Sequence, residues 1–338
     1  MAREKVLVVG AGGIAGAWFP AILAEKLHVC GVVDLRRTAA VERIAHYKVQ
    51  APAFTSLADA LAATRPDFVI DLTVPDAHCA VTCEALRHSL PVIGEKPMAA
   101  SMSQARRMVR TAEKASTLYM VSQSRRWDPL HAAVATAVRA GAIGRITTIN
   151  CDFYVGAHFG GFRDEMQSPL ILDMAIHHFD LARFFSGADP QRVYAFEFNP
   201  YGSWYKGDVA ASCIFEMDNS IVFTYRGSWC AEGCHTSWNG NWRIIGDKGT
   251  IICENDQPPH GETVTGTTGF IRPKKPLRIP VPAMKRRSMH GALAEMLVYL
   301  RTGTRPQTEC HDNIKSLAMV FAAIESARKG RRIRVRCQ

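Results

Sequence analysis

The stretch Val6-Leu7-Val8-Val9-Gly10-Ala11-Gly12-Gly13-Ile14-Ala15-Gly16 decides the fold of this chain, because an apolar, β-branched run ends there in a glycine-rich turn. A helix-like segment over residues 18–26 follows, and then a second apolar run over 29–33 that ends at Asp34. Strand, glycine turn, helix, strand and acid, in this order, are typical of a dinucleotide-binding unit. Glycine-rich turns alone are common, so the prediction rests on the order of the elements around this turn.

Each small residue of the turn has an expected task. Gly10 allows the tight turn, Gly12 lets the backbone approach a pyrophosphate, and Ala15 lets the helix pack closely on the strand. The unpaired N–H groups and the macrodipole at the start of the helix favour a negatively charged group. Gly13 and Ile14 lead into this helix. We therefore expect them to bind the cofactor together with Gly10, Gly12 and Ala15.

Asp34 is the residue expected to select the cofactor. An acid at this position accepts hydrogen bonds from the adenosine ribose hydroxyls and repels a 2′-phosphate, which predicts a preference for NAD. Arg36 and Arg37 follow almost immediately. Because an arginine can pair with a 2′-phosphate, NADP stays open as an alternative cofactor.

Length and composition indicate a globular protein of two domains. A chain of 338 residues is too long to form one ordinary hydrophobic core, which predicts two domains. Of its residues 47% are hydrophobic and 21% are charged, as in globular proteins. No apolar run approaches the ~20 residues of a membrane span, and ten scattered cysteines suit a reducing cytoplasm. Of the net charge of +10, residues 1–124 carry +3, and the remaining +7 is concentrated in two acid-free stretches, residues 272–287 and 328–338, which is weak evidence for nucleic-acid binding. We expect a cytoplasmic protein with no nucleic-acid partner and no membrane partner.

Short apolar runs alternate with helical segments as far as residue 122. Helices are expected over 39–47, 56–64, 77–88 and 101–115, and strands over 67–73, 91–94 and 118–122. This alternation predicts an N-terminal Rossmann domain, α/β with a doubly wound parallel sheet, over residues 1–124. Ligands of such sheets lie beyond the carboxyl ends of the strands, where Thr73 and the pair Glu95-Lys96 stand.

The regular alternation of strand-like and helical segments ends after residue 124. Helices are expected over 129–140 and 170–185, and four or five strand-like runs without intervening helices fill residues 192–253. This pattern predicts a second, α+β domain over residues 125–338, built on a mostly antiparallel, open-faced sheet. Four prolines in the basic stretch 272–287 predict a solvated loop or a subunit-contact arm, not a helix, and leave its role open.

Two groups suit the chemistry of an oxidoreductase. Lys96, at a strand end next to the expected nicotinamide, can place an ammonium against a developing alkoxide, although an ordinary surface lysine is the alternative. Asp173 and His177 share one helix face at a spacing of four residues. An imidazole there is suited to general-base work, but a helix cap or a core histidine is equally compatible with the spacing.

Three further segments keep two interpretations each. The loop over 158–163 either lines a substrate pocket or only connects two elements, and the aromatic loop over 201–205 either stacks on a sugar or joins a subunit contact. Cys230, Cys234 and His235 resemble a metal-ligand spacing only loosely. Because no second cysteine pair completes four ligands, no metal site is expected there.

Taken together, these residues resemble the glucose–fructose oxidoreductase/inositol dehydrogenase (Gfo/Idh/MocA) family over nearly the whole chain. The resemblance rests on the glycine turn with Asp34, Pro75 with His78, Glu95-Lys96-Pro97, Arg126-Trp127-Asp128-Pro129, Asp173 with His177, and Ile245-Gly246-Asp247-Lys248-Gly249-Thr250. It implies that Lys96 and His177 are catalytic and that Asp173 holds the substrate.

The resemblance also implies further contacts. Those to the cofactor would come from Arg36, Thr73, Pro75, His78, Glu95 and Lys96. Those to the substrate would come from Lys96, Arg126, Trp127, Asp173 and His177. The sheet of the second domain would build a homodimer or homotetramer.

The expected activity is hydride transfer between NAD and a secondary alcohol of a sugar, polyol or sugar derivative. His177 would take the hydroxyl proton and Lys96 would stabilise the alkoxide. Carbonyl reduction uses the same residues, so the sequence favours neither direction. The alternative is a regulator that binds dinucleotide and sugar without turnover; it predicts the loss of Lys96 or His177, and both are present.

Overall fold

The structure, a computed structural model, describes residues 3–337 and divides into two compact units. The first unit joins the residues up to Ser124 with Arg286–Ile314, and the second joins Arg125–Lys285 with Lys315–Cys337. The sequence predicts that residues 286–314 belong to the second domain. In the structure they belong to the first unit, where Arg286 and His290 both donate to the carboxylate of Glu25.

The first unit is built on a six-stranded sheet whose neighbouring strands are all parallel, which confirms the predicted doubly wound Rossmann fold. In spatial order the strands are β3 (Ala53–Phe54), β2 (His28–Val33), β1 (Lys5–Val9), β4 (Phe68–Asp71), β5 (Val92–Gly94) and β6 (Tyr119–Val121). Val9 lies opposite Val33 on one side and Asp71 on the other, so the carboxyl ends of three strands are level. Ligands of such sheets bind at this edge.

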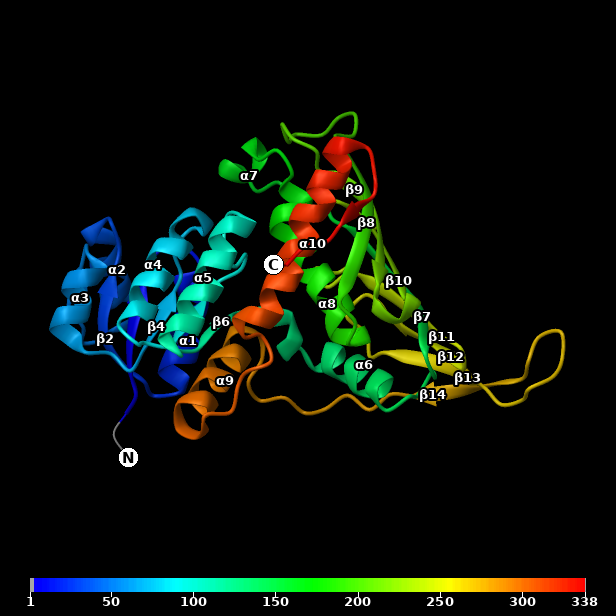
Figure 1. The fold of residues 1–338 in the computed structure, drawn as a ribbon, viewed down its shortest axis with the longest axis horizontal. Coiled ribbons are helices and arrows are strands. Elements are labelled where there is room, and N and C mark those ends of the chain that lie inside the picture. The colour runs from blue at the N-terminus through cyan, green and yellow to red at the C-terminus, as the bar shows by residue number, and fades with distance from the viewer. Residues whose placement is uncertain (1–2, 338) are drawn as a thin grey trace. The chain divides into compact units, whose positions relative to one another are not determined.

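Helices connect these strands and cover the sheet (Figure 1). They are α1 (Ala15–Ala24), α2 (Arg37–Tyr47), α3 (Leu57–Thr64), α4 (Pro75–Arg87), α5 (Met102–Ala115) and α9 (Ser288–Thr302). α4 packs beside α5, and α1 packs against α9. Two of them begin at a side-chain N-cap, because Ser56 accepts from the amide of Asp59 and Ser101 accepts from the amide of Gln104.

The second unit is built on a nine-stranded mixed sheet. In spatial order its strands are β14 (Lys274–Arg278), β13 (His260–Val264), β12 (Gly249–Cys253), β11 (Asn241–Gly246), β7 (Ile146–Tyr154), β10 (Val222–Ser228), β9 (Ala210–Met217), β8 (Pro190–Phe198) and β15 (Ile333–Arg334). β7 and β10 run parallel, and the other neighbouring pairs run antiparallel. The prediction of a mostly antiparallel sheet is confirmed.

Helical segments pack on one face of this sheet (Figure 1). They are α6 (Pro129–Arg139), η2 (Leu170–Ala175), α8 (Ile176–Ser186) and the part of α10 (Cys310–Lys329) that starts at Lys315. Phe179 of α8 packs edge-on against Phe215 of β9 with ring centroids 4.8 Å apart, and Phe185 packs on Trp242 of β11. All four rings are buried, so the helix is held by aromatic packing.

Three details differ from the sequence interpretation or extend it. The basic stretch is not wholly a loop, because residues 274–278 form the edge strand β14, where a proline is tolerated at position 276. The hairpin between β9 and β10 turns at the short 3-10 helix η3 (Asp218–Ser220). Among residues 3–337, no helix is both long and apolar enough to cross a membrane.

Candidate active site

The glycine turn follows β1 directly and leaves its backbone open to a ligand. Gly10 has a φ of +99°, and a Cβ added to it would lie 2.6 Å from the carbonyl of Leu72. Only glycine therefore fits this position. A Cβ added to Gly12 or Gly13 would meet no atom within 4 Å, so no neighbouring atom crowds the side of the turn where a ligand would approach these two residues. Ala15, the first residue of α1, is fully buried.

Asp34 is held at the end of β2 by the backbone of the glycine turn. Its Oδ2 accepts from the amide of Ala11 over 2.9 Å, and its Oδ1 accepts from the amide of Arg36 over 2.9 Å. Arg43 of α2 adds a contact that the sequence interpretation missed, since its guanidinium donates to the carbonyls of Ala11 and Gly12. No local pattern predicts this contact, because it depends on how α2 packs.

A buried polar cluster follows β4. Asp71 is fully buried, and its Oδ1 accepts from the hydroxyl of Thr73 over 2.6 Å while its Oδ2 accepts from Thr82. His78 lies with Nδ1 3.1 Å from the same Asp71 oxygen. Pro75 is the first residue of α4. Its missing N–H costs no hydrogen bond there, because the first N–H groups of a helix have no acceptor within the helix. Thr73, Pro75 and His78, expected at the cofactor, therefore lie within one short segment that Asp71 organises.

Glu95 and Lys96 follow β5 at the same edge of the sheet. The Glu95 carboxylate is buried and accepts from the indole N–H of Trp18 over 2.6 Å and from the amide of Lys96 over 3.1 Å. Burial raises the pKa of Glu95, and the indole and the nearby ammonium oppose that rise only partly. The glutamate thus fixes the backbone from which the Lys96 side chain extends.

In the second unit, Asp173 and His177 lie on the helical segment η2–α8. Residues Leu170–Ala175 form a π-helical turn, and α8 continues from Ile176. π-helical turns are rare and occur frequently at functional sites. The predicted helix is confirmed, and its first turn is wider than the sequence interpretation assumed.

Arg163 contacts the predicted substrate residue Asp173. Its Nε lies 2.7 Å from Asp173 Oδ2, and its guanidinium lies over the rings of Phe159 and Phe162 at 4.9 and 4.7 Å. Gly160 and Gly161, just before α7 (Phe162–Glu165), both have positive φ angles. The loop over 158–163 is thus more than a connection, since it brings a cation to the Asp173 carboxylate.

Arg125 and His178 form a second cluster next to this helix face. His178 is fully buried, and the Arg125 guanidinium lies 3.4 Å from its Nε2 while donating to the carbonyl of Trp238. Burial lowers the pKa of His178 well below its usual range, and that of Arg125 to about 10. His178 is therefore a neutral core histidine.

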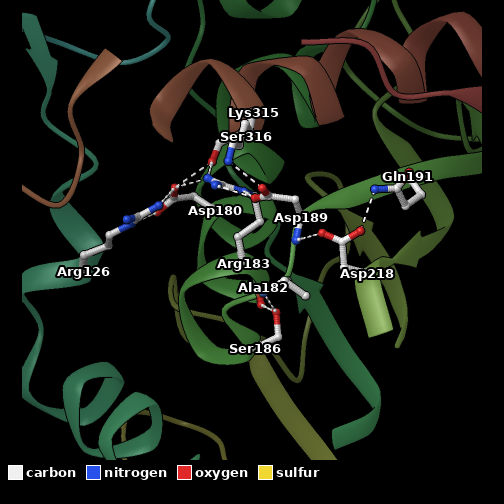
Figure 2. A network of polar contacts seen from close by, with 11 residues as sticks. Arg126, Asp180, Ala182, Arg183, Ser186, Asp189, Gln191, Asp218, Lys315 and Ser316 are labelled. Atoms are coloured by element: carbon white, nitrogen blue, oxygen red, sulfur yellow. Dashed lines mark hydrogen bonds and ion pairs between the residues drawn. The ribbon is translucent and has the colours of Figure 1, made fainter. Parts of the chain in front are cut away.

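Arg126 lies in a buried ion pair (Figure 2). Its Nε and one terminal nitrogen donate to the two carboxylate oxygens of Asp180 over 2.8 and 2.6 Å. Ser316 of α10 donates to the same carboxylate, and Arg183 donates to Ser316. Trp127 is also buried. The predicted contacts of Arg126 and Trp127 with substrate stay predictions, and in the structure Arg126 pairs with Asp180.

Comparison with family models matches both units. Residues 4–123 match the model described as the oxidoreductase family with an NAD-binding Rossmann fold. Residues 131–252 match the model described as the GFO/IDH/MocA C-terminal domain.

Individual proteins are similar to this chain over most of its length. The chain is 30% identical to the D-apiose dehydrogenase of Rhizobium rhizogenes, with 79% of each covered. It is 27% identical to the D-apiose dehydrogenase of Paraburkholderia graminis, covering 99% of this chain and 90% of that one. An oxidoreductase from Agrobacterium radiobacter, crystallised with NAD+, L-tartaric acid and magnesium, shares the fold with a TM-score of 0.87, 24% identity and 99% coverage of both chains.

Proposed function

Because the chain belongs to the Gfo/Idh/MocA family of oxidoreductases, we propose that it is an NAD-dependent dehydrogenase or reductase of a sugar, polyol or sugar derivative. The observation that carries the proposal is the presence of both reactive groups on ordered elements. Lys96 follows β5 at the edge where the glycine turn lies, and His177 stands one turn after Asp173. A regulator without turnover has no need for either group.

The chain's own residues supply proton transfer and charge. In the oxidation of a carbinol, His177 accepts the hydroxyl proton and the Lys96 ammonium stabilises the alkoxide character of the oxygen. Asp173 accepts a hydrogen bond from a substrate hydroxyl and so orients the sugar. A dinucleotide bound at the glycine turn would supply the hydride acceptor for the carbinol carbon, so that the oxidation balances.

NAD is the cofactor that we assign, with NADP as the alternative. Asp34 supports this choice, because its carboxylate is fixed at the end of β2 where an adenosine ribose binds in this fold. A 2′-phosphate would meet that negative charge, and Arg36 and Arg37 would have to compensate for it. The ratio of kcat/KM with NAD to kcat/KM with NADP measures whether the repulsion by Asp34 or the attraction by the two arginines is larger.

The substrate class is proposed from the names of the relatives and is tested first. Their names include D-apiose dehydrogenase and inositol 2-dehydrogenase. We therefore propose a panel of D-apiose, myo-inositol, aldoses, sugar acids and amino sugars, assayed in both directions by the absorbance of reduced nicotinamide. Binding of the dinucleotide without turnover of any panel member would favour a regulator.

The assignment of the base is tested with His177→Ala. General-base catalysis contributes typically ~10²–10⁴-fold, so kcat should fall by that order while the Kd for NAD changes no more than about threefold. His260→Ala, which removes an exposed histidine from β13, is the matched control and should leave kcat unchanged. Wild-type turnover by a folded His177→Ala variant would remove the base assignment.

Lys96→Met tests the second reactive group in the same assay. We expect kcat to fall, and the loss should not multiply with that of His177→Ala, because both groups act on one oxygen in one transition state. Strictly multiplicative losses would show that the two residues act in separate steps.

A further inference from the structure

A cluster of three potential metal ligands lies in the first unit, outside the residues assigned to the reaction. Glu309, Cys310 and His311 are consecutive and stand at the start of α10. Each offers one ligand atom, and these atoms lie within 4.8 Å of one another. Cys310 is 2% exposed, whereas the His311 side chain is 44% exposed, so one side of the cluster is open to solvent.

The distances within the cluster suit one zinc ion. Glu309 Oε2 lies 2.8 Å from His311 Nδ1 and 3.9 Å from Cys310 Sγ, and the sulfur lies 3.7 Å from the same nitrogen. The point equidistant from the three atoms in their plane is roughly 2.0 Å from each, so an ion slightly above this plane has bonds within the ~2.0–2.3 Å of zinc to oxygen, nitrogen and sulfur and keeps one side open for water. No rearrangement of the backbone is therefore needed to bring the three atoms around one ion.

A fourth residue occupies the position of an outer partner. His311 Nε2 lies 3.0 Å from Glu113 Oε1, on the side of the ring opposite to Nδ1. A histidine that binds a metal through one nitrogen usually donates its other N–H to a carboxylate, which fixes the ring and raises its basicity. Glu113 is near the end of α5, so this contact joins two elements that are distant in sequence.

We propose that Glu309, Cys310 and His311 bind a zinc ion, with Glu113 as the outer carboxylate and water as the fourth ligand. The combination of thiolate, imidazole and carboxylate selects zinc over magnesium or calcium, which prefer oxygen alone. The ion replaces the proton shared by Glu309 Oε2 and His311 Nδ1, and the thiol proton of Cys310 passes to solvent. Arg305, whose guanidinium lies 3.6 Å from Glu309 Oε2 and is 71% exposed, turns outward on binding.

The role of this ion is structural. Glu309 forms an isolated antiparallel bridge with Met120 of the edge strand β6, and the amide of Val121 donates to the carbonyl of Thr308. An ion held at 309–311 and braced by α5 would fasten this late segment of the chain to the edge of the Rossmann sheet. Zinc should consequently stabilise the folded protein without entering the hydride-transfer step.

Zinc binding by the full-length protein is the test. After treatment with a chelator and dialysis, we expect one zinc ion per chain in a competition titration, and a higher Tm with zinc than without it. Cys310→Ser and His311→Asn should each weaken binding at least 100-fold and abolish the rise in Tm. Glu113→Gln should weaken binding by ~10–100-fold, as for other outer carboxylates.

Controls separate this cluster from adventitious binding. Cys234→Ser removes an exposed thiol of the second unit and should leave zinc affinity unchanged. Cobalt(II) should give a thiolate charge-transfer band in the wild type and in Cys234→Ser, but not in Cys310→Ser. No zinc bound at micromolar free ion, or binding that survives Cys310→Ser and His311→Asn, would overturn the proposal. His311 is on the surface, so its variant should fold, and circular dichroism checks that it does.

Discussion

Arg163 donates from Nε to Oδ2 of Asp173 over 2.7 Å, so the carboxylate assigned to substrate binding has a cationic partner on the preceding loop. Both side chains are partly buried, at 32% and 14% exposed. A charge-assisted hydrogen bond in such a place orients the carboxylate. We infer that Arg163 positions Asp173 for the sugar.

Substitution of Arg163 by Gln should therefore raise the substrate KM. We expect roughly a tenfold rise, equivalent to about 1.4 kcal/mol, with the Kd for NAD unchanged. Lys206→Gln is the matched control, because Lys206 pairs with Glu165 of the same short helix but has no contact with Asp173. Steady-state kinetics on both variants makes the comparison. A lower KM in Arg163→Gln would mean that the arginine competes with the substrate for Asp173.

The buried pair of Arg126 and Asp180 leads to a prediction about stability (Figure 2). Removal of one partner leaves the other charge buried, which typically costs about 3–5 kcal/mol. Because Ser316 still donates to Asp180, Arg126→Met should lower the free energy of unfolding by about 3 kcal/mol. Urea unfolding measures this, and Arg192→Gln, which breaks an exposed pair with Glu216, should cost less than ~1 kcal/mol. A stable Arg126→Met variant with a raised substrate KM would support the substrate role predicted from the sequence.

The fold of the first unit was predictable because its physical causes are local. Strands buried on both faces become continuous apolar runs, as in Val6-Leu7-Val8-Val9, and the helices between them have their own caps at Ser56 and Ser101. The strand β3 was missed because its two residues are too few to show the alternation of apolar and polar side chains that identifies a strand. β13 and β14 were missed because exposed edge strands with glycine or proline lack the alternation of a half-buried strand.

Long-range pairing was not predictable from the same patterns. Arg126 and Asp180 are 54 residues apart, and nothing in either segment indicates that the two charges meet. The spacing of Asp173 and His177 placed both on one helix face, but the π-helical turn depends on packing beyond the helix. For the same reason, nothing in residues 286–314 indicates that their helix packs in the first unit.

Glu197 of β8 should make stability depend on pH. Burial raises the pKa of its carboxyl from 4.5 to about 7, and Oε1 has no hydrogen-bond partner among residues 3–337. Between those pH values the folded protein holds a proton that the unfolded chain has released. The free energy of unfolding should therefore fall as pH rises from about 4.5 through 7 and stay lower above it.

Glu197→Gln should remove this dependence. Relative to wild type, the variant should gain up to about 3 kcal/mol at pH 8 and much less at pH 5, since one pKa unit corresponds to about 1.4 kcal/mol. Urea unfolding at the two pH values measures the difference, with the exposed Glu254→Gln as control. An equal change at pH 5 and pH 8 would show that the Glu197 carboxyl titrates normally in the folded protein.

The sheet of the second unit has an exposed face that we propose as the contact between copies of this chain. Tyr194 and Ile214 lie opposite each other on β8 and β9 and are 46% and 49% exposed. Phe196 is 57% exposed and stacks on Phe198 with ring centroids 5.7 Å apart. Such a group of apolar side chains on strands is typical of a surface that a second copy covers.

Phe196→Glu should then reduce the oligomer to single chains. Burying a phenyl ring contributes about 1.5–3 kcal/mol per copy, and a carboxylate in its place would also have to be desolvated. In size-exclusion chromatography with light scattering, the wild type should show a multiple of 37.3 kDa and the variant the mass of one chain. Phe270→Glu, which changes a fully exposed phenylalanine in the loop between β13 and β14, should keep the wild-type mass. A wild type that is monomeric at micromolar concentration, or a Phe196→Glu variant that keeps its assembly, would show that this face is not the contact.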